Sequence, residues 1–239
     1  MSTKNSVLLR SRDRISGNSS DFELKVQYAL DGEHAVKNIQ IANSCYSVRA
    51  GVNDKIYFYE NSTAKSATIT AGQYTSSTIA SAIKTVMDTA SGGHNTYTVT
   101  FASSTQKITF SASNAFYFQF ASNTSASARR IMGFDAEDTA SGSSVTSTNA
   151  IDLTGTHAVY IAIPEAEHNL RKSGGPLRSS LYVPLNVDVN SFQNLAQSGD
   201  FQQILTFDRE TALSVKLYDD DGNDLSLNGV EWSMLLQKR

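Results

Sequence analysis

The chain is poor in cysteine and in charged residues. Its 239 residues include one cysteine, Cys45, so no disulfide can form within the chain, which argues against a disulfide-stapled secreted domain. Charged residues make up 18% of the chain, below the roughly 25% of an average soluble protein. The formal net charge is −3 and the lysines and arginines are scattered, so the composition gives no indication of a nucleic-acid-binding surface.

Long apolar runs are also missing. No stretch approaches the ~20 apolar residues that a membrane-spanning helix needs. The segment from Met1 to Arg10 is polar, so we expect no signal peptide. The missing charge is replaced by Ser, Thr, Asn and Gln, which suit turns and the solvent faces of strands. The composition therefore indicates many strands joined by short polar turns.

Alternation of apolar and polar residues predicts about a dozen strands. In the first clear one, Phe22, Leu24 and Val26 lie on one face, with charged and polar residues between them. Pro184 interrupts a later alternating segment and favours an edge strand or a bulge there. No strand–helix–strand repetition is present. The pattern excludes a doubly wound fold and favours an all-β sandwich or barrel.

One helix is expected, between residues 75 and 91. Ile79, Ile83, Val86 and Met87 form a single apolar stripe at helical spacing. Polar residues that can cap a helix precede the stripe, and two glycines follow it. Two alternating segments come next and predict a hairpin, so this part of the chain has its own helix and strands.

The residues that most often carry catalysis or bind metals do not form a recognisable motif. The histidines, His34, His94, His157 and His168, are far apart in sequence and lie in predicted turns, loops or a strand start. We interpret them as exposed histidines, with a metal site assembled through tertiary contacts as the alternative. Cys45 has no histidine in its local sequence, so we interpret it as a packed or incidental thiol rather than a nucleophile.

Three further segments come close to known functional motifs but do not match them. Residues 142–146 end in Thr where a nucleophile elbow needs Gly. Residues 173–176 lack the Lys-Ser/Thr of a phosphate-binding loop, and Pro176 removes a backbone N–H. Glu165 and Glu167 stand in a predicted exposed loop, without a pocket to shift their pKa values. We therefore expect no catalytic, cofactor-binding or metal-binding residues and no enzymatic activity.

Two clusters leave alternatives open. The run Asp219–Asp224 fails the spacing of an EF-hand loop, because Leu217 stands five residues before Gly222 where a carboxylate is needed. We interpret it as a solvated hairpin turn, with a weak cation site as the alternative. The aromatic segment Tyr57–Tyr59 is interpreted as a strand with one side facing solvent or a partner. Its alternative role is the stacking of bases or sugars.

Two stretches of the sequence resemble a known family. The first is "TITAGQYTSSTIASAIKTVMDTA" with "YTVTFASSTQKITFSA", "FYFQF" and "IMGFD". The second is "ALSVKLYDDDGNDLSLNGVEWSMLLQ". Both are similar to segments of viral penton and minor capsid proteins. The landmarks that carry the resemblance are Gly72, Tyr74, Ile79, Ile83, Val99, Phe101, Ile108, Phe110, Ile131, Gly133, Phe134, Leu225, Leu227, Asn228, Gly229 and Trp232.

This resemblance implies the penton of a double-stranded DNA virus, of the type shared by virophages, polinton-like viruses and nucleocytoplasmic large DNA viruses. Such a protein has a single jelly roll and forms a homopentamer at the five-fold vertex of an icosahedral virion. It is a structural protein of the capsid, and its partners are copies of itself, the double jelly-roll major capsid protein and other minor capsid proteins. The alternative is another minor capsid protein or a host-attachment protein that binds glycans.

The resemblance and the strand pattern together predict the domain organisation. We expect an extended N-terminal arm over residues 1–20 and a jelly-roll β-sandwich over residues 21–60 and 136–239. Residues 61–135 are expected to form a small insertion module of β-α-β-β type. The arm carries three arginines and is expected to become ordered on assembly.

Overall fold

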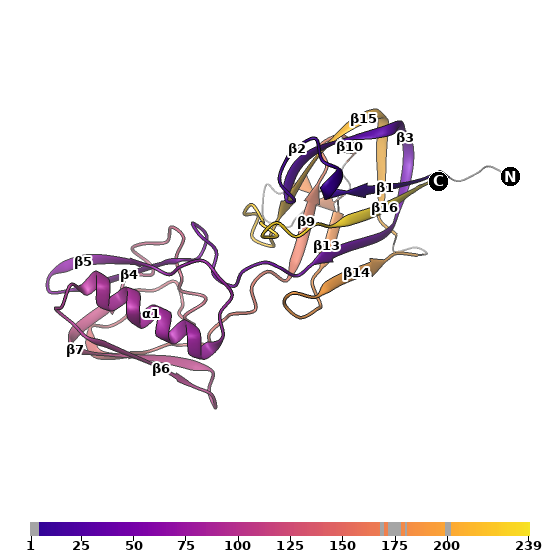
Figure 1. The fold of residues 1–239 in the computed structure, drawn as a ribbon. Coiled ribbons are helices and arrows are strands. Elements are labelled where there is room, and N and C mark those ends of the chain that lie inside the picture. Colours follow the sequence, from indigo (N-terminus) through magenta and orange to yellow (C-terminus); the bar gives the residue numbers. More distant parts are fainter. Residues whose placement is uncertain (1–4, 168–169, 172–177, 180, 199–201) are drawn as a thin grey trace. The chain divides into compact units, whose positions relative to one another are not determined.

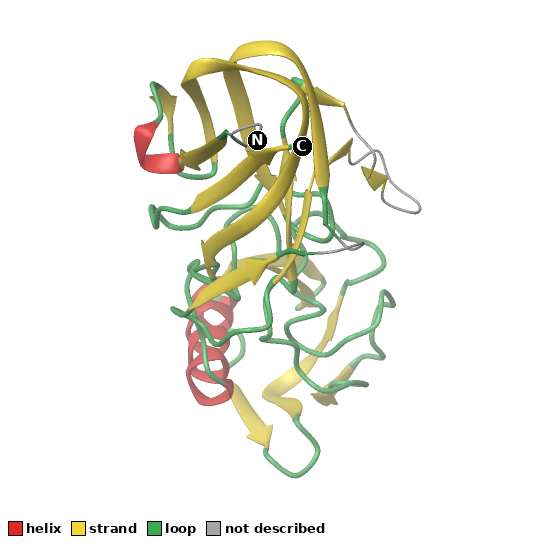
Figure 2. Ribbon diagram, turned by 90° about the vertical axis from the view of Figure 1, so that its right-hand side faces the viewer, coloured by secondary structure: helices red, strands yellow, loops and turns green. Residues whose placement is uncertain are grey.

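A computed structural model describes residues 5–167, 170–171, 178–179, 181–198 and 202–239 of the chain (Figure 1). The chain forms two compact units. One comprises Met1–Cys45 and Thr156–Arg239, and the other comprises Tyr46–Gly155. Each unit has its own hydrophobic core. Strands dominate both, and no helix in the described part of the chain is long and apolar enough to cross a membrane (Figure 2).

The first unit is built almost entirely of antiparallel strands. Two of them are long, and each changes partners along its length. A short 3-10 helix, η1, spans Ser11–Asp13. The strands are β1 (Ser6–Arg10), β2 (Ser16–Gly17), β3 (Asp21–Ala42), β9 (Ala158–Ala162), β10 (Ala166–Glu167), β11 (Leu170–Arg171), β12 (Arg178–Ser179), β13 (Leu181–Pro184), β14 (Phe192–Ala196), β15 (Ile204–Tyr218) and β16 (Ser233–Lys238).

The long strands β3 and β15 divide these elements into two sheets. The second half of β3 lies between β16 and β14, and β16 also pairs with β1. This first sheet has the order β1-β16-β3-β14. The first half of β3 pairs with the second half of β15, which continues to β9 and β13. The second sheet therefore has the order β3-β15-β9-β13. The two register shifts of the β3–β15 ladder lie between these halves, around Arg209 with its positive φ of 55°.

The inward faces of the two sheets make one core. Leu9, Ile39 and Met234 of the first sheet join Leu24 and Ile161 of the second in a single buried cluster. Eight strand segments in two four-stranded antiparallel sheets, packed face to face in this order, form a jelly roll. The expected fold class, an all-β single jelly roll with a helix-containing insertion, is thus confirmed. We call this part the jelly-roll unit.

The second unit is inserted between the third and fourth strands of the jelly roll, and we call it the inserted unit. Its main sheet has the order β5-β4-β7-β6, and β8 also pairs with β7. Ile79, Ile83 and Met87 of the helix are fully buried in the same core as the phenylalanines of β7. The elements are β4 (Lys55–Glu60), β5 (Thr63–Thr68), α1 (Ser76–Ser91), β6 (Tyr97–Ala102), β7 (Lys107–Phe118) and β8 (Gly142–Thr146).

The helix α1 begins at a capping box formed by Thr75 and Thr78. The Thr75 hydroxyl accepts a hydrogen bond from the Thr78 N–H at 3.3 Å, and the Thr78 hydroxyl accepts one from the Thr75 N–H at 2.9 Å. We expect Thr75→Ala to lower the stability of the inserted unit by about 1 kcal/mol, since a backbone donor loses its partner. Chemical denaturation measures the change. Thr85→Ala, at an exposed mid-helix position, is the control and should cause no loss.

The boundaries of the inserted unit differ from those expected. They lie at 45/46 and 155/156 rather than at 60/61 and 135/136. The strand β4 pairs with β5 and β7 instead of joining the jelly roll, because its inward Ile56 and Phe58 pack in the second core. Residues 136–155 also belong here, since β8 pairs with β7 and Leu153 packs on the same core. Alternation alone predicted β4 as a strand but could not assign it to a core.

The expected N-terminal arm also differs from the structure. Residues 6–17 form β1, η1 and β2, and β1 pairs with β16 along its whole length. Leu9 is 5% exposed and belongs to the jelly-roll core. The segment is therefore the first strand of the jelly roll. Only two of its residues, Val7 and Leu9, point inward, and an alternation of this length is too short to predict a strand from the sequence. Residues 1–4 lie outside the described part.

Candidate interaction surfaces

The thiol and one of the histidines are buried. Cys45 is 4% exposed and packs in the jelly-roll core, in line with the packed thiol expected from the sequence. His34 is buried rather than exposed, with its ring 5.6 Å from that of Phe207 and Nδ1 3.1 Å from the Gly32 carbonyl oxygen. Within the described ranges, no three His, Cys, Asp or Glu side chains come together as a metal site would require. His168 lies outside those ranges.

The acidic run of residues 219–224 is a turn organised by a buried carboxylate. Asp219 is 0% exposed and accepts hydrogen bonds from the N–H groups of Asp221 and Asn223 at 2.9 and 2.7 Å. The expectation of a solvated turn therefore holds for its neighbours but not for Asp219 itself. Lys216 contacts Asp224 at 2.9 Å, and this hydrogen bond is the main reason why the pKa of Lys216 is raised.

The aromatic segment of β4 divides between the two sides of its sheet. Phe58 is fully buried in the core of the inserted unit. Tyr57 and Tyr59 are half-buried on the opposite side, where Tyr59 stacks on Tyr117 with ring centroids 5.1 Å apart. Glu165, considered above as one of two paired carboxylates, accepts hydrogen bonds from the N–H and hydroxyl of Ser214 at 3.0 and 2.8 Å. Residues 173–176 are not described.

Exposed apolar side chains of the jelly roll gather on the outward face of the first sheet. Leu8 on β1 and Phe192 on β14 are 53% and 52% exposed. They border a hollow of about 340 Å³ whose other walls include Arg10, Arg12 and Trp232. We call this surface the Leu8–Phe192 face. Large exposed apolar side chains around a concave surface are typical of a protein interface.

Ion pairs hold the edge of this face. Arg14 contacts Glu231 at 2.7 Å, and the Ser11 hydroxyl donates a hydrogen bond to the same carboxylate. Burial opposes the charged form of Glu231, but these bonds outweigh it and hold its pKa below the ordinary value. Arg10 pairs with Asp13 at 2.6 Å. The charged rim is thus fixed in place beside the hollow.

The outward face of the second sheet carries a row of three tyrosines on adjacent strands. Tyr218 of β15 lies opposite Tyr160 of β9, which lies opposite Tyr182 of β13. The rings of Tyr160 and Tyr182 are 5.4 Å apart, and Tyr182 is 39% exposed. Burial, then the neighbouring Tyr182 and Asp220, raise the pKa of Tyr160. We call Tyr160, Tyr182 and Tyr218 the tyrosine row. The sequence showed each strand but not that these tyrosines align.

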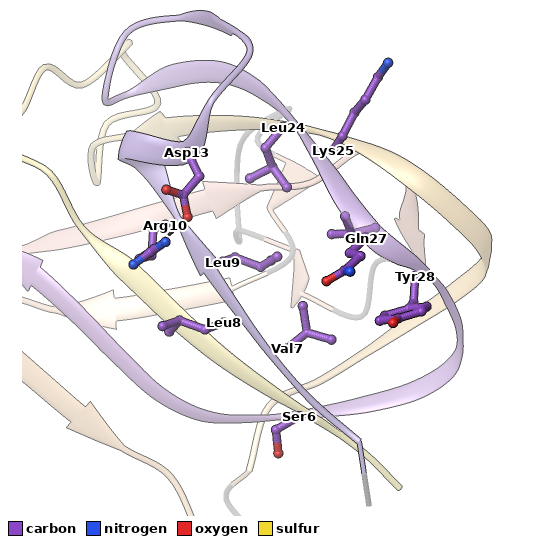
Figure 3. Close-up of a pocket in the computed structure, with 11 residues that line it drawn as sticks. Ser6, Val7, Leu8, Leu9, Arg10, Asp13, Leu24, Lys25, Gln27 and Tyr28 are labelled. Atoms are coloured by element: carbon purple, nitrogen blue, oxygen red, sulfur yellow. Dashed lines mark hydrogen bonds and ion pairs between the residues drawn. The ribbon is translucent and has the colours of Figure 1, made fainter.

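A third surface is the groove between β1 and the first half of β3. It encloses about 390 Å³ and is lined by residues 6–10, Asp13 and residues 24–28 (Figure 3). Leu9 and Leu24 form its apolar floor, and Tyr28, 75% exposed, lies at one end. Among the described residues, β1 pairs only with β16, so its other edge faces this groove. An unpaired edge strand can accept a further strand.

Comparison with known proteins gives similarity to solved structures only. No family model and no curated protein matches it. The crystal structure of the mavirus penton protein is similar over 98% of this chain and 91% of its own, with 12% identity and a TM-score of 0.43. A chain of the 3.5 Å cryo-EM structure of the Sputnik virophage is similar over 98% of this chain and 96% of its own, with 12% identity and a TM-score of 0.45.

Proposed function

We propose that this chain is a structural capsid protein whose copies form the homopentameric penton at the five-fold vertices of an icosahedral virion. The observation that carries the proposal is the jelly roll itself, an architecture that viral capsid domains use repeatedly. The inserted unit enters it between the third and fourth strands, at 45/46 and 155/156.

The surface of the jelly roll supports the same proposal. Its sheets expose Leu8, Phe192 and Tyr182, large side chains of the kind that subunit interfaces bury. Aromatic side chains are enriched at subunit interfaces, and charged residues are depleted at interface cores. In the capsid, the partners would be further copies of this chain, the double jelly-roll major capsid protein and other minor capsid proteins. The role is structural, and the place is the virion.

Electron microscopy and native mass spectrometry of the purified chain test this function. We expect rings with five-fold symmetry and a species of five times the 25.9 kDa chain mass, with monomers at low concentration. Pentamers that form only with the major capsid protein present would also agree. A stable trimer in both measurements would contradict the proposal.

A second candidate is a host-attachment protein that binds glycans. The observation in its favour is the half-buried pair Tyr59 and Tyr117, with Tyr57 on the same side of the sheet of the inserted unit. Tyrosine rings offer the flat apolar surface on which sugar rings stack. Saturation-transfer NMR with a panel of glycans tests this role. Signals that disappear in Tyr59→Ala would favour attachment over the vertex.

A further inference from the structure

We propose that adjacent copies join head to tail through the jelly roll, with the tyrosine row of one copy seated on the Leu8–Phe192 face of the next. The inference rests on the proposed homopentamer and names the residues that would close it. The partner is a second copy of this chain. Each copy would use both surfaces, one toward each neighbour in the ring.

The first argument is the placement of the two surfaces. Leu8 and Phe192 point outward from the sheet β1-β16-β3-β14, and the tyrosine row points outward from the sheet β3-β15-β9-β13. Because the two sheets share one core, their outward faces are directed away from each other. One copy therefore cannot cover its own tyrosine row with its own Leu8–Phe192 face. Contact between two different patches is heterologous, the kind of contact from which closed rings are built when the rotation between neighbours closes.

The second argument is complementary shape and chemistry. The Leu8–Phe192 face is hollowed, with about 340 Å³ between its walls. The tyrosine row is a cross-strand array of large amphipathic rings, with Tyr182 its most exposed member. The hollow is bordered by Leu8, Phe192 and Trp232 together with polar side chains, so a tyrosine ring seated there can bury its apolar face while its hydroxyl keeps a polar partner.

The third argument is charge. Arg10, Arg12 and Glu231 border the hollow; Arg10 pairs with Asp13 and Glu231 pairs with Arg14, while Arg12 is exposed. The pKa of Tyr160 is raised in part by Asp220, which places an acidic group beside the tyrosine row. His157 is 3.6 Å from the same carboxylate. A guanidinium group from one copy can thus meet a carboxylate from the next.

These charged groups also lie toward the same end of the jelly roll. Arg10 ends β1, and Asp220 follows the end of β15 at Tyr218. Both strand ends lie next to the β2–β3 turn, where Ser19 O accepts the Trp232 indole N–H and Ser20 O accepts the Leu217 N–H. Copies related by a rotation about an axis parallel to the strands would therefore present the basic rim of one copy level with the acidic end of the tyrosine row of another.

A complementation experiment tests the head-to-tail contact. Leu8→Glu disables one surface and Tyr182→Glu the other, so each variant alone should be monomeric, with association weakened about 30-fold or more. Mixed in equal amounts, they retain one intact contact per pair: the tyrosine row of the Leu8→Glu chain on the Leu8–Phe192 face of the Tyr182→Glu chain. Analytical ultracentrifugation of the mixture should show a heterodimer that neither variant forms alone.

Matched controls separate the contact from folding and from general surface charge. Ile15→Glu replaces a similarly exposed residue, 58%, that lies outside all three candidate surfaces, and rings should persist. Circular dichroism verifies that every variant is folded. Phe192→Glu repeats the test of the first surface if Leu8→Glu does not fold.

The outcomes distinguish this inference from the proposed function. Rings that persist in Leu8→Glu, Phe192→Glu or Tyr182→Glu, or a mixture without heterodimers, would overturn the contact and leave the pentamer standing. A parent chain that forms trimers would overturn the pentamer itself. A parent that stays monomeric together with a mixture that stays monomeric would count against the contact, because hot-spot burial of this kind predicts measurable affinity.

Discussion

A chain with Trp232→Ala is expected to lose most of the stability of its jelly-roll unit while the inserted unit stays folded. Trp232, the only tryptophan, is 5% exposed and packs edge-on against Phe22 with ring centroids 6.0 Å apart. Its indole N–H donates to the Ser19 carbonyl at 2.8 Å. Replacing a buried aromatic residue by alanine costs about 3–5 kcal/mol, a large part of the 5–15 kcal/mol that holds a typical domain.

The position of Trp232 explains why the effect should spread through the unit. The Ser11 N–H donates to the Trp232 carbonyl at 3.0 Å, and the Trp232 N–H donates to the Ser11 hydroxyl at 2.9 Å. The residue therefore joins the start of the last strand to the end of the first. Loss of the ring loosens both, and with them the sheet that carries the Leu8–Phe192 face. Assembly should fail together with folding.

Hydrogen exchange followed by mass spectrometry measures this expectation region by region. Exchange should accelerate across residues 21–42 and 204–218 and stay unchanged across residues 55–118, because the two cores are separate. Trp232→Phe is the control: it keeps an aromatic ring beside Phe22, removes the N–H donor and part of the buried ring volume, and should cost less than alanine. Equal acceleration in both units would show that they unfold as one, contrary to the separate cores.

Periodicity predicted the parts of the fold in which burial follows a regular repeat. Phe22 and Leu24 are both 4% exposed, as their alternation indicated. The apolar stripe of α1 is buried at Ile79, Ile83 and Met87. Gly133 closes a helical turn with φ 73°, and a Cβ there would lie 2.4 Å from the Asn149 carbonyl oxygen, so the turn requires glycine.

What the sequence did not show depends on contacts between distant segments. The strand β1 becomes recognisable only through its pairing with β16, more than two hundred residues later. The tyrosine row needs the registers of three strands, which alternation leaves undefined. The buried charge of Glu60 was likewise missed, because a polar residue at an inward position looks like the end of a strand pattern. A polar residue in phase with Ile56 and Phe58 was the available signal.

Glu60 is the centre of a buried polar network in the inserted unit, and its loss is the second large effect that we expect. The side chain is 1% exposed, and Oε2 accepts hydrogen bonds from the Tyr97 hydroxyl and the Asn95 amide, both at 2.7 Å. Glu60→Ala leaves these buried donors without an acceptor, which costs about 3–5 kcal/mol. The Ser113 hydroxyl and the Asn114 N–H also bond to Asn95, so the disturbance should reach β7.

The same carboxylate makes the stability of the inserted unit depend on pH. Burial disfavours the charged form, but hydrogen bonds from Ser91, Tyr97 and Asn95 outweigh it and lower the pKa of Glu60 below its ordinary value of 4.5. A lowered folded-state pKa means that the charged form is favoured by folding. The stabilisation is therefore fully present above about pH 4.5 and is lost as the pH falls through the folded-state value.

Denaturant unfolding at a series of pH values between 7 and about 3, followed by hydrogen exchange in residues 97–118, measures this loss. Asp138 contributes as well, because hydrogen bonds from Ser122 and Ala121 lower its pKa despite the opposing effect of burial. The part that belongs to Glu60 is the part that disappears in Glu60→Gln, whose stability should be lower at pH 7 and vary less with acid. Glu137→Gln, at an exposed position of the same unit, should leave the pH profile unchanged.

If Glu60→Gln kept the full acid sensitivity of the parent chain, the carboxylate would not be the group that titrates. The network around Tyr97 would then stabilise the unit through packing alone.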